Sequence, residues 1–195
     1  MGFKFTKLTT HGAFNSAAEV FVDGVSNSTF SAPNNGSATA PAATTIKALS
    51  FGSSVYRLIE VVWPYGDSLD FLYIRVNSEA TVTAPTAPRP AAKICVLGDS
   101  ITQGFSLAQT SQSWSYKLGE LKGRQIVNLG YGGRTAVGAD GSAVASTGCA
   151  SVFYMIGTND FNGQRNVADF QASVRPALPD DQSGNPRLLL PDCRG

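Results

Sequence analysis

The chain has 195 residues, of which 43% are hydrophobic and 15% are charged, and its formal net charge is +1. This composition is typical of a globular protein long enough to bury a core, as one large domain or two small ones. A charge near zero, without a basic cluster, argues against nucleic-acid binding. No stretch approaches eighteen apolar residues in a row, and the amino terminus lacks the apolar core of a secretory signal. We therefore expect no nucleic-acid and no membrane partner, and leave open whether the chain is cytoplasmic or exported by another route.

The three cysteines, at positions 95, 149 and 193, are isolated and odd in number. This pattern argues against a disulfide framework and against a cysteine-based metal site. We expect Cys95 to pack in a buried strand as a small hydrophobic side chain. Neither a metal nor a cofactor is expected.

The first part of the chain, to about residue 84, has no helical period and is broken repeatedly by Gly, Asn, Ser and Pro. The segment 26–44 is rich in Ser, Asn, Ala and Pro, which favours a loop or a weak edge strand. The spacing of the candidate strands predicts a small β-sandwich of the jelly-roll kind over residues 1–84. The candidate strands are 3–8, 19–22, 45–51, 55–63, 70–76 and 81–84.

Residues 85–92 contain three prolines, at positions 85, 88 and 90, and are predicted to be a linker. From Lys93 onward strands and helices alternate, which predicts an α/β domain over 93–195 with a parallel sheet covered by helices. The helix at 113–122 has Trp114, Leu118 and Leu121 at helical spacing, so we expect these three side chains to form its buried face. The expected strands are 93–98, 125–129 and 151–156, and a last helix is expected over 167–175.

The most informative stretch is Gly98-Asp99-Ser100-Ile101-Thr102, directly after the apolar run Ile94–Leu97. The run is typical of a strand buried on both faces. Gly98 permits a sharp turn, and Asp99 is able to accept hydrogen bonds from the amides ahead of it. Ser100 then lies at the carboxyl end of a strand, where open α/β sheets place their sites. It is a candidate nucleophile; the alternative is a serine that only caps a helix or ends a turn.

Two more polar blocks follow later strands. The first is Asn128-Leu-Gly-Tyr-Gly-Gly-Arg-Thr135, whose glycines at 130, 132 and 133 allow backbone amides to approach a ligand, or simply make a tight turn. The second is Ile156-Gly-Thr-Asn-Asp160. Asn159 offers a neutral amide donor of the kind that stabilises an oxyanion; alternatively Asn159 or Asp160 caps a helix.

Together, in this order, the three blocks resemble the GDSL/SGNH hydrolases. The resemblance implies a flavodoxin-like α/β fold and ester hydrolysis, with Ser100 as the nucleophile. It further implies an oxyanion hole made by the backbone N–H of Ser100, that of Gly133 and the side chain of Asn159. A β-sandwich before such a domain is similar to the arrangement in bacterial carbohydrate esterases that remove acetyl groups. The expected substrate is therefore a small-molecule or polysaccharide ester.

One block of the family has no counterpart in this sequence. The family carries an Asp-x-x-His block, whose histidine deprotonates the serine. The chain has a single histidine, His11, and Asp192 is followed at the +3 position by Gly195. We expect a truncation or a shifted reading frame after about Arg175, and a chain that is inactive or nearly so.

Two other functions are compatible with the sequence. One is a glycan-binding protein with a catalytically incomplete hydrolase domain, in which aromatic residues such as Trp63, Tyr65 and Tyr73 stack on sugar rings; aromatic residues in strands also commonly belong to the core. The other is a structural protein of two domains. Measured ester turnover separates an ester hydrolase from the glycan-binding protein. The sequence leaves the oligomeric state open.

Overall fold

The computed structural model describes residues 2–6, 17–30, 43–65, 68–86 and 91–177. The chain divides into two compact units. The first unit comprises residues 1–89 and 104–118, and the second comprises 90–103 and 119–195. The segment 104–118 thus belongs to the first unit, although it follows the proline-rich segment in the chain. The domain limits predicted from sequence stay a prediction.

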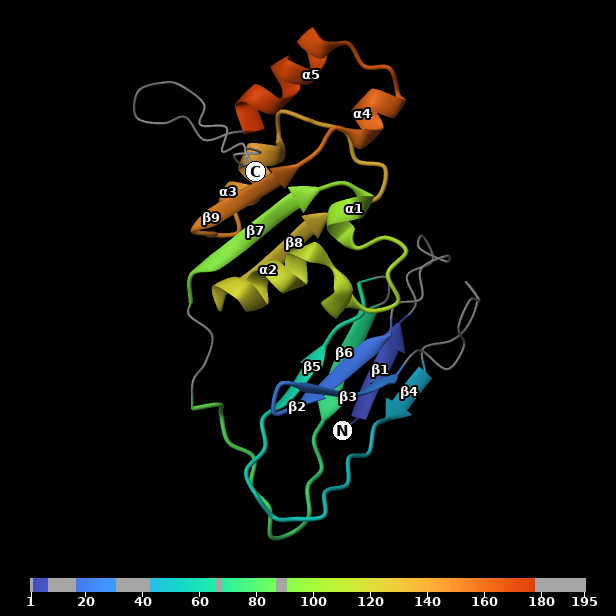
Figure 1. Ribbon diagram of the computed structural model, residues 1–195, viewed down its shortest axis with the longest axis vertical. Coiled ribbons are helices and arrows are strands. Elements are labelled where there is room, and N and C mark those ends of the chain that lie inside the picture. Colours follow the sequence, from blue (N-terminus) through green and yellow to red (C-terminus); the bar gives the residue numbers. More distant parts are fainter. Residues whose placement is uncertain (1, 7–16, 31–42, 66–67, 87–90, 178–195) are drawn as a thin grey trace, which may run out of the picture. The chain divides into compact units, whose positions relative to one another are not determined.

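The first unit contains two three-stranded antiparallel sheets (Figure 1). Its core is made by Ala18, Val20 and Phe30, on which partly buried side chains such as Ile59 pack. The antiparallel strands agree with the all-β texture of this part of the sequence, whereas the jelly-roll order stays a prediction. One sheet has the order β4 (Ala43–Ile46), β1 (Gly2–Thr6), β6 (Ser68–Tyr73), and the other has the order β3 (Val25–Phe30), β2 (Ala18–Val22), β5 (Ile59–Val62).

Two segments of the first unit, 25–30 and 81–84, can be compared with what the sequence predicts for them. Residues 25–30 form an edge strand, β3, one of the two alternatives for this region. It pairs with β2 through a two-residue turn, Asp23-Gly24, in which both residues have positive φ, the backbone that such hairpins require. The strand expected over 81–84 is wrong, because this segment has no regular structure.

The second unit is built on a parallel sheet of the order β8 (Gln125–Gly130), β7 (Lys93–Gly98), β9 (Ser151–Met155). The central strand β7 is buried from Ile94 to Gly98, as its apolar run predicts. Gly98 pairs with Gly130 on one side and Met155 on the other, so the carboxyl ends of the three strands are level. The predicted class, a mixed α/β fold with a parallel sheet flanked by helices, is confirmed.

Helices pack on both faces of this sheet. Cys95 and Leu97 contact Val144 of α3 (Asp140–Ala145). Residues of opposite parity face the other side, where a Cβ on Gly119 of α2 (Trp114–Lys122) would lie 2.7 Å from Ile126. This close approach leaves room for a glycine alone.

Helix α2 lies where the sequence predicts it, but its buried face differs. Ser113 caps its first turn, accepting a hydrogen bond from the backbone N–H of Tyr116. Leu121 is 80% exposed, so the prediction of its burial is wrong. The buried side of the helix is centred on the small residues Ser115 and Gly119. Leu121 lies two residues after Gly119, about 200° further round the helix.

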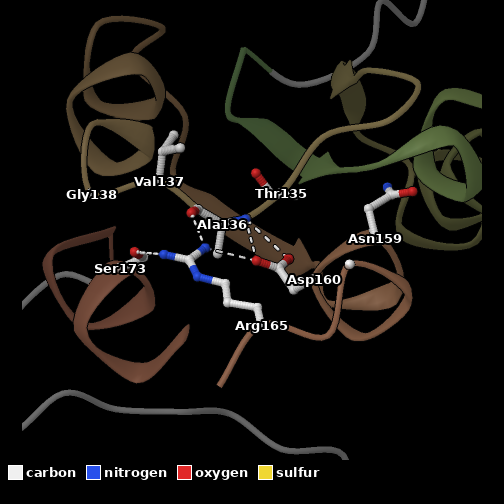
Figure 2. A pocket seen from close by; sticks show the side chains of 9 residues that line it. Thr135, Ala136, Val137, Gly138, Asn159, Asp160, Arg165 and Ser173 are labelled. Atoms are coloured by element: carbon white, nitrogen blue, oxygen red, sulfur yellow. Dashed lines mark hydrogen bonds and ion pairs between the residues drawn. The ribbon is translucent and has the colours of Figure 1, made fainter. Parts of the chain in front are cut away.

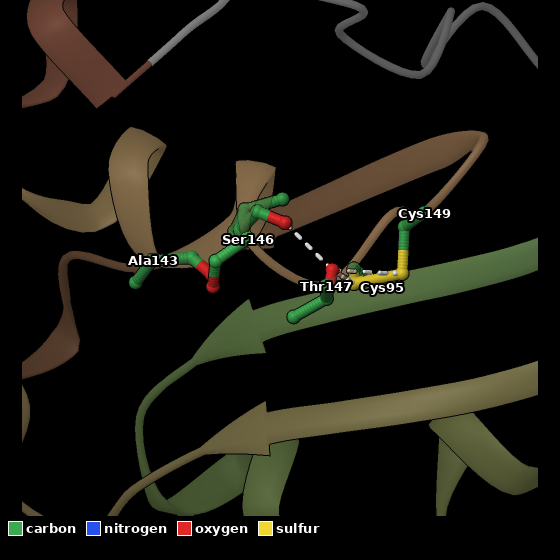
Figure 3. Close-up of a disulfide and its surroundings, with 6 residues drawn as sticks. Cys95, Ala143, Ser146, Thr147 and Cys149 are labelled. Carbon is green, nitrogen blue, oxygen red and sulfur yellow. Dashed lines mark hydrogen bonds between the residues drawn. A yellow bond between two sulfur atoms is a disulfide. The ribbon is translucent and has the colours of Figure 1, made fainter.

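A disulfide joins Cys95 to Cys149 (Figure 3), so the prediction against disulfides from three isolated cysteines is wrong, whereas Cys95 is buried in β7 as expected. Cys95 lies in β7, and Cys149 ends the connection that leads into β9. These two strands are neighbours, with Ile94 paired to Ser151. The pairing brings the two cysteines together with their Cα atoms 5.7 Å apart. Their separation of 54 residues along the chain gives no hint of this contact.

Candidate active site

Ser100 lies at the carboxyl end of the central strand. The strand β7 ends at Gly98, and α1 (Ser100–Gln103) begins one residue later. Asp99 is buried in this turn, and its carboxylate accepts a hydrogen bond of 2.9 Å from the N–H of Ile101. This contact, expected from the motif, makes the turn rigid and leaves Ser100 half-buried at the edge of the sheet.

The loop after β8 is hydrogen-bonded to this turn. The side-chain amide of Asn128 donates to the carbonyl of Thr102 over 2.8 Å, and its oxygen accepts from the N–H of Gly130 over 2.9 Å. The N–H of Tyr131 donates to the carbonyl of Gly98. Gly130 lies so close to α1 that a Cβ there would be 2.2 Å from the backbone nitrogen of Gln103. The loop and the Ser100 turn are therefore held together through the backbone.

Gly133 and Asn159 are joined through the same loop. Gly133 has a φ of 77°, a conformation that favours glycine. Asn159 lies in α4 (Thr158–Asn162), which follows β9, and its side-chain amide donates a hydrogen bond of 2.9 Å to the carbonyl of Arg134. One N–H of the Asn159 amide remains for another acceptor. No side chain caps α4, so the alternative role of Asn159 or Asp160 as its cap is wrong.

Asp160 also holds the loop after β8. Its carboxylate is only 3% exposed and accepts from the N–H of Ala136, at 3.1 and 3.3 Å from its two oxygens, and from Arg165 at 2.7 Å (Figure 2). An open pocket of about 500 Å³ adjoins these residues. Its lining consists of Thr135, Ala136, Val137, Gly138, Asn159, Asp160, Gly163, Arg165 and Ser173.

A second buried carboxylate, Asp140, also contacts this loop. It is completely buried and forms an ion pair with Arg134. The hydroxyl of Tyr154, in β9, donates a hydrogen bond to it. Burial, together with this carboxylate, raises the pKa of the Tyr154 hydroxyl well above its ordinary value. Sequence reasoning missed this cluster; Arg134 stands in the glycine block, but Asp140 and Tyr154 belong to no motif.

The arrangement places the Ser100 hydroxyl and the Asn159 side-chain amide on segments that follow neighbouring strands of the parallel sheet. Ser100, Gly133 and Asn159 each follow a different strand, and hydrogen bonds join the segments that carry them. Within the described part of the chain, no group of three His, Cys, Asp or Glu side chains is placed to hold a metal ion. Of the helices described, none is long and apolar enough to cross a membrane. His11 and Asp192 lie outside the described residues.

Comparison with known proteins finds similarity to one family. Residues 96–188 match the model of the GDSL-like lipase/acylhydrolase family. No curated protein matches the chain. Among solved structures, a protein from Bacteroides ovatus described as a GDSL-like lipase is 20% identical, with a TM-score of 0.65 over 92% of this chain and 55% of that one.

Two further structures share the fold. A salicylyl-acyltransferase of a tetracycline biosynthetic pathway is 16% identical, with a TM-score of 0.63 over 90% of this chain and 50% of that one. A family two carbohydrate esterase from Clostridium thermocellum is 16% identical, with a TM-score of 0.57 over 90% of this chain and 63% of that one. The chain thus spans roughly half to two thirds of the length of these proteins. Over residues 96–188, just under half of its length, the chain is similar to the GDSL-like lipase/acylhydrolase family.

Proposed function

We propose that the second unit carries an ester-hydrolase site in which Ser100 is the nucleophile. The oxyanion of the intermediate is bound by the backbone N–H groups of Ser100 and Gly133 and by the side-chain amide of Asn159. The observation that carries this proposal is the hydrogen-bonded link between the three loops, from Asn128 to Thr102 and from Asn159 to the carbonyl of Arg134. It supports a common site at the carboxyl edge of the sheet.

The reaction has two steps. The Ser100 oxygen attacks the acyl carbon, the ester C–O bond breaks, and the alcohol leaves with the proton of the serine hydroxyl. Water then attacks the acyl-serine, which releases the carboxylic acid and restores the hydroxyl. Each oxyanion donor contributes about 3 to 4 kcal/mol of transition-state stabilisation in comparable hydrolases.

The blocks that make up this proposed site contain no histidine to act as the general base. The only histidine of the chain is His11, which precedes the hydrolase-like segment and belongs to none of its blocks. Without a base the Ser100 hydroxyl stays protonated at neutral pH and is a poor nucleophile. Loss of the base alone costs about 10⁶ in turnover in a well-studied serine hydrolase, while the oxyanion hole and binding keep about 10³ to 10⁴ over water. We therefore propose that this 195-residue chain turns over esters very slowly.

The proposed substrate is an acyl ester of a carbohydrate, with acetyl as the acyl group. A carbohydrate esterase is among the proteins that share this fold, which supports testing sugar acetates first. The family model, named for lipases and acylhydrolases, supports the broader class of carboxylic esters.

The test compares the parent chain with Ser100→Ala on p-nitrophenyl acetate and on an acetylated xylo-oligosaccharide. Ser142→Ala, in an exposed position of α3, is the matched control. We expect slow acetylation in the parent and the control, detected as a mass increase of one acetyl group, and none in Ser100→Ala. Fusion of a segment that carries Asp-x-x-His should raise turnover. If Ser100→Ala is acetylated as fast as the parent, Ser100 is not the nucleophile. If the parent turns over esters at an ordinary enzymatic rate, the proposal that the chain lacks a general base is wrong.

A second candidate function is glycan binding by the first unit. Trp63 and Tyr73 expose 40% and 39% of their surfaces, and an exposed aromatic ring is able to stack on a sugar. Affinity electrophoresis in gels that contain xylan or cellulose derivatives tests this function. If the parent is retarded, Trp63→Ala is not, and the parent shows no ester turnover, these results together favour a glycan-binding function.

A further inference from the structure

The side chain of Arg165 donates hydrogen bonds to several segments near the proposed site, although it belongs to none of the sequence blocks. Its Nη1 donates to the carbonyl of Ala136 over 2.8 Å and to Asp160 over 2.7 Å (Figure 2). Its Nη2 donates to the carbonyl of Asp169 over 3.0 Å and to the hydroxyl of Ser173. The two terminal nitrogens of the guanidinium are thus fully used in contacts with other parts of the second unit.

These contacts join three separate segments. Ala136 belongs to the loop after β8, Asp160 to α4, and Asp169 and Ser173 to α5 (Val167–Val174). Asp160 adds a second link, because it also accepts from the N–H of Ala136. Ala136 is therefore held at both its N–H and its carbonyl, the first by the carboxylate and the second by the guanidinium.

Packing alone does not hold this loop. Thr135, Val137 and Gly138 are exposed, and the open pocket borders them on the side of Arg165. A loop with few buried apolar contacts depends on its hydrogen bonds for a fixed conformation. Its buried anchors are the backbone of Ala136, which is 1% exposed, the carboxylate of Asp160, and the carboxylate of Asp140, which holds Arg134 nearer the start of the loop.

We propose that Arg165 is a positioning residue for the oxyanion hole, and this inference rests on the proposed function. Gly133 lies three residues before Ala136, and Asn159 is the residue before Asp160. The clamp of Arg165 and Asp160 on Ala136 sets the distance between the two segments that carry these donors. Preorganised donors stabilise an oxyanion only when they are already in place, and a displacement of about 1 Å is enough to cost roughly 100-fold in rate.

The test uses Arg165→Gln and Arg165→Lys in the full chain, with Arg175→Gln as the matched control. Arg175 lies just after α5 and is exposed. Two quantities are measured: the rate of acetylation by p-nitrophenyl acetate, and the ¹H–¹⁵N signals of the Gly133 amide, the Ala136 amide and the Asn159 side chain. The NMR readout does not depend on catalysis.

We expect Arg165→Gln to slow acetylation of Ser100 by about 10- to 100-fold and to shift the Gly133 and Asn159 signals. The Ala136 amide should exchange faster with solvent. Arg165→Lys keeps the charge but not the planar guanidinium, so we expect its acetylation rate to lie between those of Arg165→Gln and the parent. If Arg165→Gln does not fold, Arg165→Lys replaces it in both measurements. In the double variant with Asn159→Ala the two losses should add only in part, because part of the Arg165 effect acts through the Asn159 amide.

The inference is overturned if folded Arg165→Gln keeps the parent's signals at Gly133 and Asn159, or keeps the parent's rate of Ser100 acetylation. In either case Arg165 only anchors α5. If Ser100→Ala is acetylated as fast as the parent, the proposed function fails instead, and the NMR signals then decide separately whether Arg165 positions the loop.

Discussion

The side-chain amide of Asn159 donates a hydrogen bond of 2.9 Å to the backbone carbonyl of Arg134, which directly follows Gly133. This contact places the third motif of the sequence against the second. It also orients the amide of Asn159, because one of its two N–H groups is used in this hydrogen bond.

The first prediction concerns Asn159→Ala. We expect acetylation of Ser100 by p-nitrophenyl acetate to fall about 100- to 1,000-fold, the usual cost of losing one oxyanion donor. The free energy of unfolding should fall by only about 1 kcal/mol, because one partly exposed hydrogen bond is lost. Asn162→Ala, at the exposed end of the same helix, should behave like the parent. An unchanged acetylation rate in Asn159→Ala would remove this residue from the site.

The second prediction concerns the disulfide between Cys95 and Cys149. The bond closes a long loop, so its reduction should lower the free energy of unfolding by about 4 kcal/mol in the chain-entropy model. The chain has three cysteines, so thiol titration of the oxidised, denatured chain should find one thiol and the reduced chain three. Cys193→Ala should lower both numbers by one. Three thiols in a chain never exposed to reductant would contradict the pairing.

The third prediction concerns Glu19, a buried carboxylate in β2. It accepts hydrogen bonds from both the N–H of Ser111 (3.0 Å) and its hydroxyl (2.6 Å). Glu19→Ala leaves these donors without an acceptor, which should cost about 2 to 3 kcal/mol. Both tryptophans, Trp63 and Trp114, belong to the first unit, so tryptophan fluorescence in urea follows its unfolding.

The matched control for this third prediction is Glu79→Ala, in an exposed turn of the same unit. It should leave the unfolding midpoint in place. Equal midpoints for Glu19→Ala and Glu79→Ala would show that the Ser111 contact contributes nothing to stability.

The fourth prediction concerns the pKa of Tyr154, which burial and the neighbouring Asp140 raise above its ordinary value near 10. Above about pH 10 the unfolded chain loses this proton while the folded chain keeps it. Stability linked to Tyr154 is therefore complete below pH 10 and declines as the pH rises. We expect the free energy of unfolding to fall more steeply above pH 10 in the parent than in Tyr154→Phe.

Absorbance at 295 nm checks this assignment directly. At about pH 11 the folded parent and folded Tyr154→Phe should form the same amount of tyrosinate, whereas in urea the parent should form one more. A difference of one tyrosinate between the folded proteins would mean that Tyr154 titrates normally.

Local patterns determined much of this protein. The apolar run before Gly98 predicts a buried strand, and the strand is found there because its burial on both faces needs only apolar side chains in sequence. The Gly-Asp-Ser turn and the cap at Ser113 are likewise contacts between residues a few positions apart. The hairpin at Asp23-Gly24 carried a local signal too, which the polar composition of β3 concealed.

Contacts between distant residues were decided by the tertiary structure alone. Cys95 bonds to Cys149 because β7 and β9 are neighbours in the sheet. The spacing of residues along the chain does not determine which strands are neighbours. Leu121 is exposed because the small residue Gly119, rather than a large apolar one, sets where α2 meets the sheet. The positions of the cysteines and the period of the helix can be read from the sequence. Which cysteines pair, and which side of the helix packs on the sheet, cannot.

The residues of the candidate site also fall into two groups, those predicted from sequence motifs and those found only in the tertiary structure. Ser100, Gly133 and Asn159 stand in motifs that are recognisable by themselves, because each is a short turn after a strand. Arg165, Asp140 and Tyr154 belong to no motif, and their contacts join the loop after β8, the strand β9 and the helices α3, α4 and α5, which only the tertiary structure brings together. A charged side chain buried among distant segments needs partners that satisfy it, and which segments supply them depends on the packing of the whole unit.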